Sequence, residues 1–404
     1  MKYSTKWLLL MLVVAMGGVY ATNQAGGTSL EKRGDKKIKP VKIYKYNKLK
    51  DITADGRYLL FFQTKSPVTL GIFRSDGTAS VNKSDTSADA LRVVEFKSGK
   101  EIARKNNRGG GRFIPNTKQI YFIDGDDSAK YIWNYESDVT KLCFKRESGV
   151  SNIRFLNEKE GFAVVSYKID GFPSQLLARL ELPSCKLKKF GDVYPPGLDP
   201  KNLYNRIDIY AGITLTADKK QFLYVVRDKA IVRSTSTLEI EKEFTVDPLV
   251  LSQHANRPVF TSDGKHLILQ ADNGELLNGK SGVKKRYFIL IYDAKTYKKL
   301  NQFEVQGEQY MTVSQDGRFI AVAYKTEKNE FLRKTDQAHI DLFDLKTGQK
   351  LATMSHKRLK QKRNNPWRSA IGKMMFTPDG KYLLTSADDT YVWDVSFLTK
   401  NIRK

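Results

Sequence analysis

Short runs of apolar residues, rich in β-branched and aromatic side chains, follow one another from residue 41 onward and alternate with turn-forming residues. Runs of this length and composition are typical of β-strands. No long segment repeats its apolar residues with the 3.6-residue period of an amphipathic helix. The pattern therefore predicts an all-β protein.

Four segments share a pattern in which Asp-Gly-Lys or Asp-Gly-Arg separates two apolar runs. They are DITADGRYLLFF (51–62), VFTSDGKHLILQ (259–270), TVSQDGRFIAVA (312–323) and MFTPDGKYLLTS (375–386). Glycine supplies the positive φ angle that a tight turn between two strands requires. Three degenerate copies fit the same frame: FIPNTKQIYFI (113–123), FLNEKEGFAVV (155–165) and LTADKKQFLYVV (215–226). Together, the segments predict seven strand–turn–strand repeats.

The equivalent turn positions are Asp55, Asn116, Glu158, Asp218, Asp263, Asp316 and Asp379. Six intervals separate the first from the last, and they average 54 residues. In the strong repeats a third apolar run ends in an aromatic–acidic pair, and a fourth follows a Gly-Lys or Lys-Lys turn. Four strands in a repeat of this length predict a seven-bladed β-propeller, in which each blade buries its faces against its neighbours.

The two ends of the repeat region suggest how the ring closes. The last repeat stops after its third strand, at 391–397, whereas the segment VKIYKY (41–46) precedes the first blade without a place in it. We expect this N-terminal strand to complete the last blade, because pairing of the two termini covers an open sheet edge.

The repeat endings carry a family resemblance. Val392-Trp393-Asp394-Val395 matches the WD dipeptide, and Tyr292-Asp293 and Phe343-Asp344 are variants of it. Residues 41–398 resemble the WD40-like and YVTN-type β-propeller repeat families. The resemblance implies the fold but no single function, since this fold carries scaffolds, receptors and enzymes. The Gly-His pair that precedes the first strand in WD40 repeats is missing from every blade. We therefore do not expect the Asp-His-Ser/Thr-Trp network of that family.

Long connections are expected on one face of the propeller. Successive strands of a meander alternate in direction, so the connections between second and third strands share a face with those between blades. The connections between second and third strands are long at 63–89, 271–285 and 324–338. The connections between blades are long at 190–207 and 355–370. Loops of this length are more often functional than accidental. The looped face is therefore the predicted binding face.

The N-terminal residues 1–21 read as a signal peptide. Lys2 and Lys6 precede an apolar run from Trp7, and Val19-Tyr20-Ala21 places small residues at a cleavage point. A retained anchor is the less favoured alternative, since a span needs about 20 residues. We expect an exported protein, periplasmic or secreted, without a transmembrane span after cleavage. Residues 22–40 are a predicted basic flexible arm, 41–398 the propeller, and 399–404 a basic tail.

The charge predicts anionic partners. Lys and Arg number 69 against 44 Asp and Glu, which leaves a formal net charge of +25. The segment richest in basic residues is 345–373, with nine Lys and Arg and no Asp or Glu. Its candidate binding residues are Lys357, Arg358, Lys360, Lys362, Arg363, Trp367 and Arg368. Ring closure would bring the Lys-rich segment 32–50 to the same blade. The alternative is a solvated loop that keeps the protein soluble.

Cysteine and histidine usage excludes several classes of site. Two cysteines rule out a Cys-rich zinc module, and the four histidines are too scattered for a local metal motif, so no metal or cofactor is expected. Cys143 and Cys185 are assigned to the outermost strands of blades two and three. A disulfide between the blades is possible, but two free thiols are favoured, since outer strands of adjacent blades diverge.

The leading hypothesis is an exported, non-catalytic propeller that acts as a binding or scaffold module for a protein or an anionic cell-envelope partner through its looped face. No local motif of a hydrolase or metalloprotease is present. The alternative is a propeller enzyme, a lactonase-like hydrolase or a YVTN-type oxidoreductase accessory, with its site in the central channel. Nucleic-acid binding suits the charge but not export, and is therefore not expected.

Overall fold

The computed structural model describes residues 36–45, 47–63, 89–106, 109–125, 127–169, 172–192, 213–226, 229–246, 258–272, 286–306, 310–330, 333–356, 359–360, 371–387 and 389–396. Residues 37–404 form one compact unit. The predicted signal peptide (1–21) and basic tail (399–404) lie outside the described residues.

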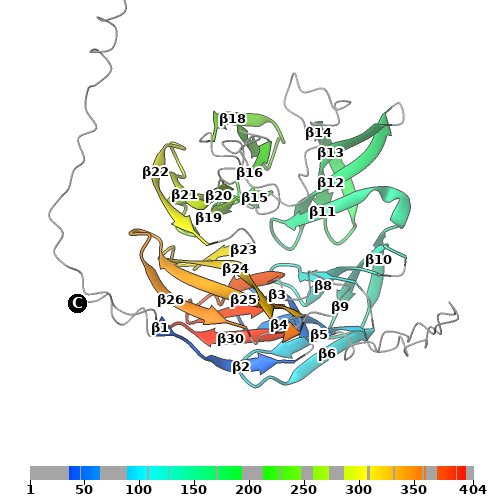
Figure 1. The fold of residues 1–404 in the computed structure, drawn as a ribbon. Helices are drawn as coiled ribbons and strands as arrows, with labels where there is room; N and C mark the ends of the chain where they lie inside the picture. The colour runs from blue at the N-terminus through cyan, green and yellow to red at the C-terminus, as the bar shows by residue number, and fades with distance from the viewer. Residues whose placement is uncertain are drawn as a thin grey trace, which may run out of the picture. The chain divides into compact units, whose positions relative to one another are not determined.

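Seven antiparallel sheets follow one another along the chain as the blades of a propeller, so the predicted fold is confirmed (Figure 1). Blades one to three are β3–β6 (Asn47–Ile52, Tyr58–Gln63, Ala90–Glu95, Glu101–Asn106), β7–β10 (Gly111–Phe113, Gln119–Ile123, Lys130–Asn134, Thr140–Phe144) and β11–β14 (Val150–Phe155, Glu160–Ile169, Phe172–Glu181, Lys186–Asp192). Blades four and five are β15–β18 (Thr214–Leu215, Gln221–Val226, Lys229–Ser234, Ile240–Thr245) and β19–β22 (Val259–Phe260, His266–Asp272, Tyr287–Asp293, Lys299–Val305).

Blades six and seven combine strands from both ends of the chain. Blade six is β23–β26 (Tyr310–Val313, Phe319–Glu330, Arg333–Asp344, Lys350–Ser355), flanked by β27 (Leu359–Lys360) and β1 (Lys36–Lys37). Blade seven is β28–β30 (Lys373–Phe376, Tyr382–Ser386, Thr390–Asp394) completed by β2 (Pro40–Tyr44). Within the predicted flexible arm (22–40), Lys36–Lys37 and Pro40 belong to these strands.

A hydroxyl and a carboxylate shape the first turn of the strong repeats. In blade five, Thr261 Oγ1 donates to Asp263 Oδ1 (2.6 Å), which also accepts from the Lys265 backbone N–H (3.0 Å). Gly264 follows with a φ of 69°, in the left-handed region that glycine tolerates best. Equivalent hydroxyl–carboxylate pairs are Thr53–Asp55, Thr216–Asp218, Ser314–Asp316 and Thr377–Asp379. This local chemistry explains why the Ser/Thr-x-Asp-Gly pattern recurs.

The hydrophobic core is divided among the contacts between blades. Each of the seven buried clusters among the described residues joins two neighbouring blades, including the last and the first. Between blades three and four, for example, Phe162 stacks on Phe222 with ring centroids 4.8 Å apart. A single sheet therefore cannot bury its faces alone, and stability depends on the complete ring.

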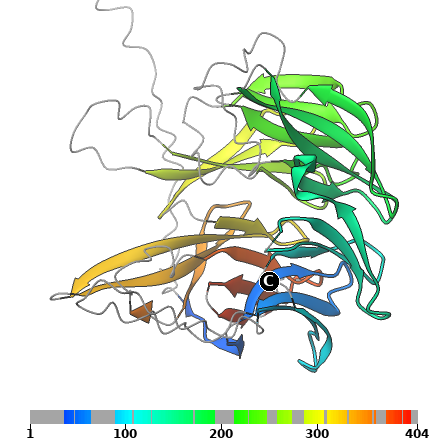
Figure 2. The same ribbon diagram turned by 90° about the vertical axis from the view of Figure 1, so that its right-hand side faces the viewer.

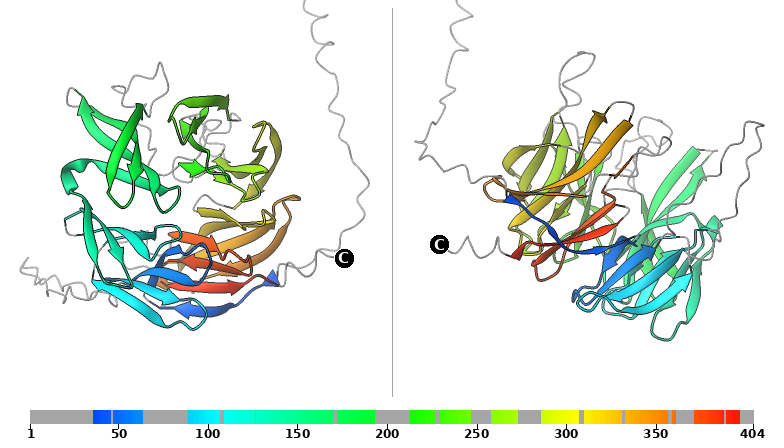
Figure 3. Two further views of the ribbon diagram at one scale, coloured as in Figure 1. Left: turned by 180° about the vertical axis from the view of Figure 1, so that it is seen from behind. Right: turned by 60° about the horizontal axis from the view of Figure 1, so that its bottom comes forward.

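The N-terminal strand closes the ring, as predicted. β2 pairs antiparallel with β30 and forms the outer edge of blade seven, beside the red strands in Figure 3. The seam continues into blade one, where the Leu49 backbone N–H donates to Ser386 Oγ (2.9 Å). Thr390 Oγ1 donates to the Asn47 carbonyl oxygen (2.6 Å). Both hydroxyls are buried, so the seam is sealed by polar as well as apolar contacts.

One predicted loop is wrong. The segment 324–338 is not a long connection, because β24 and β25 continue as a paired hairpin from Phe319 to Asp344. This hairpin extends well beyond the rest of its blade in Figure 2. Tyr324 stacks on His339 (5.2 Å between ring centroids), and His339 Nε2 lies 2.9 Å from Thr326 Oγ1. Polar residues along both strands give this segment the composition of a loop, although its backbone pairs in register.

A buried hydrogen-bond network joins blades six and seven, contrary to our expectation. His356, which follows β26, lies with Nε2 2.6 Å from Thr385 Oγ1, and Trp393 Nε1 donates to the same hydroxyl (2.8 Å). These are three members of the WD40-type network. Ser355 stands where the family has glycine, so a search for Gly-His misses the histidine. His356 is 4% exposed, and burial lowers its pKa to about 3, so the ring is neutral.

The two cysteines are bonded, and the favoured expectation of free thiols is wrong. Cys143 in β10 and Cys185 form a disulfide with Cα atoms 5.3 Å apart. Cys185 lies in the turn before β14 rather than in the outer strand, with a φ of 60°. This turn reaches β10, since Lys141 Nζ donates to the Pro183 carbonyl oxygen (3.1 Å). A turn can therefore bridge two blades whose outer strands diverge.

Loss of this disulfide is expected to destabilise the protein. The bond links positions 42 residues apart, and closing a loop of that size stabilises the folded state by about 4 kcal/mol in the chain-entropy model. The double variant Cys143→Ser, Cys185→Ser should lose about that much in urea unfolding, and the reduced parent should behave alike. Thiol titration of the denatured, unreduced parent is the check, and two reactive thiols per chain would contradict the assignment.

Candidate functional site: a cationic cavity in the central channel

A cavity of about 300 Å³ lies where the first strands of five blades approach one another. The strands are β3, β7, β11, β23 and β28, from blades one, two, three, six and seven. First strands of neighbouring blades contact each other, as β3 does β7 and β23 does β28, so they are the innermost strands. The cavity therefore belongs to the central channel of the propeller.

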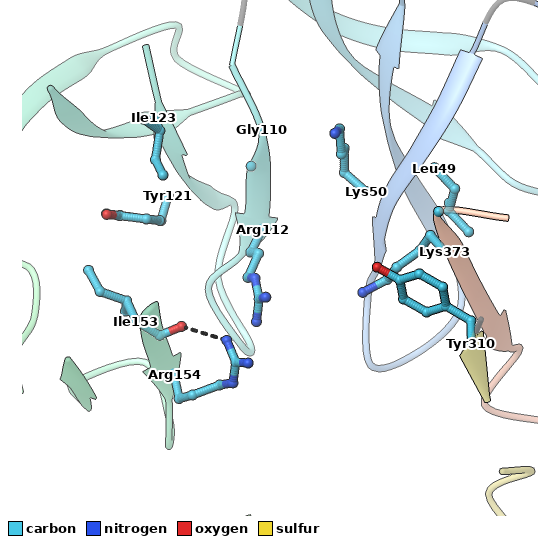
Figure 4. Close-up of a pocket in the computed structure, with 12 residues that line it drawn as sticks. Leu49, Lys50, Gly110, Arg112, Tyr121, Ile123, Ile153, Arg154, Tyr310 and Lys373 are labelled. Carbon is cyan, nitrogen blue, oxygen red and sulfur yellow. Dashed lines mark hydrogen bonds between the residues drawn. The ribbon is translucent and has the colours of Figure 1, made fainter. Parts of the chain in front are cut away.

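Four basic side chains from four blades line this cavity. They are Lys50 of β3, Arg112 of β7, Arg154 of β11 and Lys373 of β28. Figure 4 shows Arg112 and Arg154 on one side of the space, with Lys373 and the Tyr310 hydroxyl reaching in from the other. Arginine stays protonated at any physiological pH, so Arg112 and Arg154 both remain charged.

Strand alternation directs these side chains into the channel. Leu49 packs in the cluster between blades seven and one, so the next residue, Lys50, points the opposite way. Ile153 and Phe155 pack between blades two and three, and Arg154 lies between them. The Arg154 guanidinium also donates to the backbone oxygen of Ile213 in the next blade (3.3 Å) and to that of Ile153 (3.3 Å). Blade packing therefore positions these cations.

One carboxylate lies beside the cations. Asp51 Oδ2 accepts a hydrogen bond from the Phe113 backbone N–H (2.9 Å), which ties β3 to β7. Burial raises the pKa of the Asp51 carboxyl, while the charges of Lys373 and Arg112 act in the opposite direction. Burial, with a smaller contribution from Lys48, lowers the pKa of Lys50.

The cavity lies toward the looped face. Tyr310 and Lys373 are the first residues of β23 and β28, and Arg112 is the second of β7, so all three follow connections between blades. Ile123 ends the second strand of blade two, where a connection to the third strand begins. Both kinds of connection belong to the predicted binding face.

Only one residue of the predicted basic site is described. Lys360 belongs to β27, whose backbone pairs with β25 at Thr335. The others lie outside the described residues: Lys357, Arg358, Lys362, Arg363, Trp367 and Arg368. The segment nevertheless leads directly into Gly372 and Lys373, which line the cavity.

Our sequence reasoning missed the role of the cavity cations, although a signal was present. Lys50, Arg112 and Arg154 stand four or five residues before the turn positions of their repeats, and Lys373 stands six before. The basic residues thus recur in the first strands of four repeats. From the local density of Lys and Arg alone, the basic site is expected in a loop rather than in the channel.

A larger hollow of about 830 Å³ lies on the other face, at the seam of blades seven and one. Residues of both signs line it, including Arg57, Lys97, Asp55 and Glu95. Four basic and three acidic residues line it, so its charge is more evenly mixed than that of the central cavity. Among the described residues, no cluster of His, Cys, Asp and Glu could hold a metal ion. No helix in the described part of the chain has the length and apolarity to cross a membrane.

The comparisons with known proteins bear on the fold. No protein-family model matches the sequence, and no curated protein matches it. The β-propeller domain of Myceliophteria thermophila Cps50 (Swd1) is similar in structure, with a TM-score of 0.51 and 10% identity over 88% of this chain and 98% of that domain. A chain of the mitotic checkpoint complex gives a TM-score of 0.51 and 9% identity over 92% and 95%. The WD40-like resemblance is thus confirmed as one of fold: the protein is a seven-bladed β-propeller.

Proposed function

We propose that this protein is an exported, non-catalytic propeller that binds an anionic partner, a component of the cell envelope or an acidic protein, at the looped face around its channel. The observation that carries the proposal is the convergence of Lys50, Arg112, Arg154 and Lys373 on one cavity. Cations held by rigid strands create a focused positive potential that attracts and orients anions. A channel lined by cations favours anion binding over the carboxylate-rich site of a metal-dependent hydrolase.

The basic segment 357–368 shortly precedes the cavity residues Gly372 and Lys373 along the chain. Its residues 359–360 pair with the long hairpin of blade six. A polymer bound across the looped face would therefore meet cations both in the loop and in the channel. The net charge of +25 supports the same kind of partner.

Two features support export. Residues 1–21 have the composition of a signal peptide. The disulfide between Cys143 and Cys185 belongs to an oxidising compartment, since disulfides rarely persist in the cytosol.

The proposal predicts salt-dependent binding of polyanions that depends on the basic segment. Binding of heparin should weaken about 1,000-fold between 50 and 200 mM salt if six or more ionic contacts form. Replacing Lys357, Arg358, Lys360, Lys362 and Arg363 by glutamine should weaken binding and flatten this dependence, because fewer counterions are released. Affinity measured at several salt concentrations is the readout.

A matched control removes the same number of charges from the opposite face. The five exposed residues Arg57, Lys97, Lys100, Lys265 and Lys381 lie in turns within the blades. Their replacement by glutamine should leave most of the affinity intact. Equal losses in the two variants would show that only net charge matters, and parent-like binding by the first variant would remove the basic segment from the function.

A further inference from the structure

We infer that the hollow at the seam of blades seven and one is a docking site for a short acidic segment of a partner protein, anchored by one aromatic side chain. The hollow is lined by turns within the blades, on the face opposite the looped face, and takes no part in the proposed function. The inference therefore adds a second binding surface, and the two ideas can fail separately.

The outer strand at this seam contributes a lysine where another seam has an aromatic ring. Between blades five and six, Phe303 of β22 packs on Phe343 and covers Gly348, where an added Cβ would lie 2.9 Å from the Phe303 ring. Gly99 is the corresponding glycine of blade one, and an added Cβ there would lie 2.7 Å from Lys42 Nζ of β2. A lysine side chain is flexible and narrow, so it fills less of a seam than a packed ring. Lys42 accordingly borders a hollow.

Apolar side chains from both blades form the floor of the hollow. Phe96 of blade one meets Tyr382 of blade seven edge to face, with ring centroids 5.5 Å apart, and Pro378 and Val392 also line the space. Val41 of β2 is 59% exposed and continues this surface outward. The volume of about 830 Å³ has room for a ring and its neighbouring backbone. An aromatic side chain suits this floor, because it buries a large apolar area at a low cost in conformational entropy.

A β-bulge brings Val41 into the lining. The pairing of β2 with β30 shifts register between Pro40 and Lys42, so Val41 is the additional residue. Successive residues of a regular strand point to opposite sides, yet Val41 and Lys42 both line the hollow. Bulges often re-aim a side chain beside a functional site. The irregular strand thus adds an apolar residue to the rim of the hollow.

The charges beside the hollow favour an acidic partner. Residues 36–50, which include β2, contain seven lysines and no Asp or Glu. Lys42 lies over the Tyr44 ring (4.8 Å to its centroid) and has no carboxylate within ion-pair distance among the described residues. The same lysines disfavour a second copy of this chain as the occupant, because like charges would meet along the two edge strands.

The carboxylates of the hollow are engaged in their own turns. Asp55 and Asp379 each accept hydrogen bonds from a hydroxyl and a backbone N–H of the turn that they shape. Glu95 Oε2 accepts a hydrogen bond from Ser98 Oγ (2.5 Å). The exposed Lys97 ammonium, in contrast, forms no hydrogen bond or ion pair with the described part of the chain. An incoming carboxylate therefore meets cations that need no release from a partner.

The test uses fluorescently labelled peptides in which one Phe, Tyr or Trp is flanked by Glu residues on both sides, and it measures their anisotropy as the folded protein is added. We expect saturable binding of at least one of these peptides. Replacing its aromatic residue by Ala should weaken binding about tenfold or more, because the anchor fills the apolar floor. Replacing its Glu residues by Lys should abolish binding, because like charges then face each other.

Two matched pairs of variants locate binding to the hollow. Val41→Asp should weaken peptide binding about tenfold or more, because it places a carboxylate on the apolar rim. Ile43→Asp makes the same change on the same strand but outside the hollow, and should bind as the parent does. Lys97→Glu should also weaken binding about tenfold or more, with Lys100→Glu of the same turn as its control. All four side chains are exposed, so the variants should fold.

The outcomes distinguish this inference from the proposed function. The control variant that lacks Arg57, Lys97, Lys100, Lys265 and Lys381 should lose peptide binding but keep most of its heparin affinity. Absence of binding by every acidic aromatic peptide, or equal losses in Val41→Asp and Ile43→Asp, would overturn the docking site and leave the proposed function standing. Hollow-dependent peptide binding without heparin binding would support the site and refute the polymer-binding proposal.

Other occupants of the hollow would give different results. A concentration-dependent dimer that Val41→Asp abolishes would identify a second copy of this chain. Peptide binding that appears only in a chain ending at Ser396 would identify the C-terminal segment 397–404. Either result would overturn the assignment to a partner protein.

Discussion

A chain that begins at Asn47 is expected to lose the closed ring, whereas a chain that begins at Lys36 should keep it. The shorter chain lacks β2, which pairs with β30 and completes blade seven. It also loses Tyr44, whose ring lies 4.8 Å from that of Phe61 across the seam to blade one. Because every cluster of the core lies between two blades, an opened seam exposes both apolar surface and an unpaired strand edge.

The measurement is the thermal midpoint and the oligomeric state of both chains. The chain from Lys36 retains β1 and β2 and serves as the control, with a midpoint close to that of the full chain. The shorter chain should unfold at a much lower temperature or aggregate. A point variant tests the same seam in the full chain, since Tyr44→Ala should be destabilising. Equal stability of the two truncated chains would contradict closure by the N-terminal strand.

Replacement of His356 or Trp393 should produce the second largest loss of stability. Both side chains are buried, and both contact the Thr385 hydroxyl. His356 also packs on Tyr391, with ring centroids 4.1 Å apart. Trp393→Ala should cost about 3–5 kcal/mol through the cavity that it leaves. Trp393→Phe keeps most of the packing but removes the hydrogen bond that the indole N–H donates to the Thr385 hydroxyl, and should cost about 1–2 kcal/mol.

His356 should also make the protein sensitive to acid. Its pKa is about 3 in the folded state, well below the usual value near 6.5. The unfolded chain therefore binds a proton more readily, and the stability present above pH 6.5 is lost as pH falls towards 3. Between pH 7 and pH 5 the loss from this residue amounts to about 2 kcal/mol.

The check is urea unfolding of the parent and of His356→Gln at pH 7 and pH 5. The His356→Gln variant should be less stable than the parent at pH 7, because it lacks the ring that packs on Tyr391. The variant also lacks the titrating group. The difference between the two pH values should therefore shrink by about 2 kcal/mol in the variant. An unchanged difference would show that the His356 ring is not held neutral by burial.

Each correction to the sequence-based predictions concerns a contact between residues that lie apart along the chain. The hairpin β24–β25 was read as a loop because its outer half is polar, and only the cross-strand partners reveal a strand. The Gly-His pattern does not include His356, because Ser355 precedes it, whereas the hydrogen bond to Thr385 depends on the position of the imidazole alone. The disulfide was judged unfavourable from the divergence of outer strands, but Cys185 lies in a turn.

The all-β class, the seven repeats and closure of the ring by the N-terminal strand could all be predicted from the amino-acid sequence. The class follows from alternating apolar runs and from turns in which residues such as Asp263 and Gly264 satisfy their own local geometry. The repeat number and the closure follow from comparing the repeats, because the last one lacks a strand that the N-terminal segment can supply. Which distant residues meet is known only from the folded ring. Lys50 and Lys373 stand at opposite ends of the chain and share a cavity only because the ring closes. A pattern within one repeat does not show that residues so far apart in the sequence meet in space, so the cationic channel could be identified only from the folded structure.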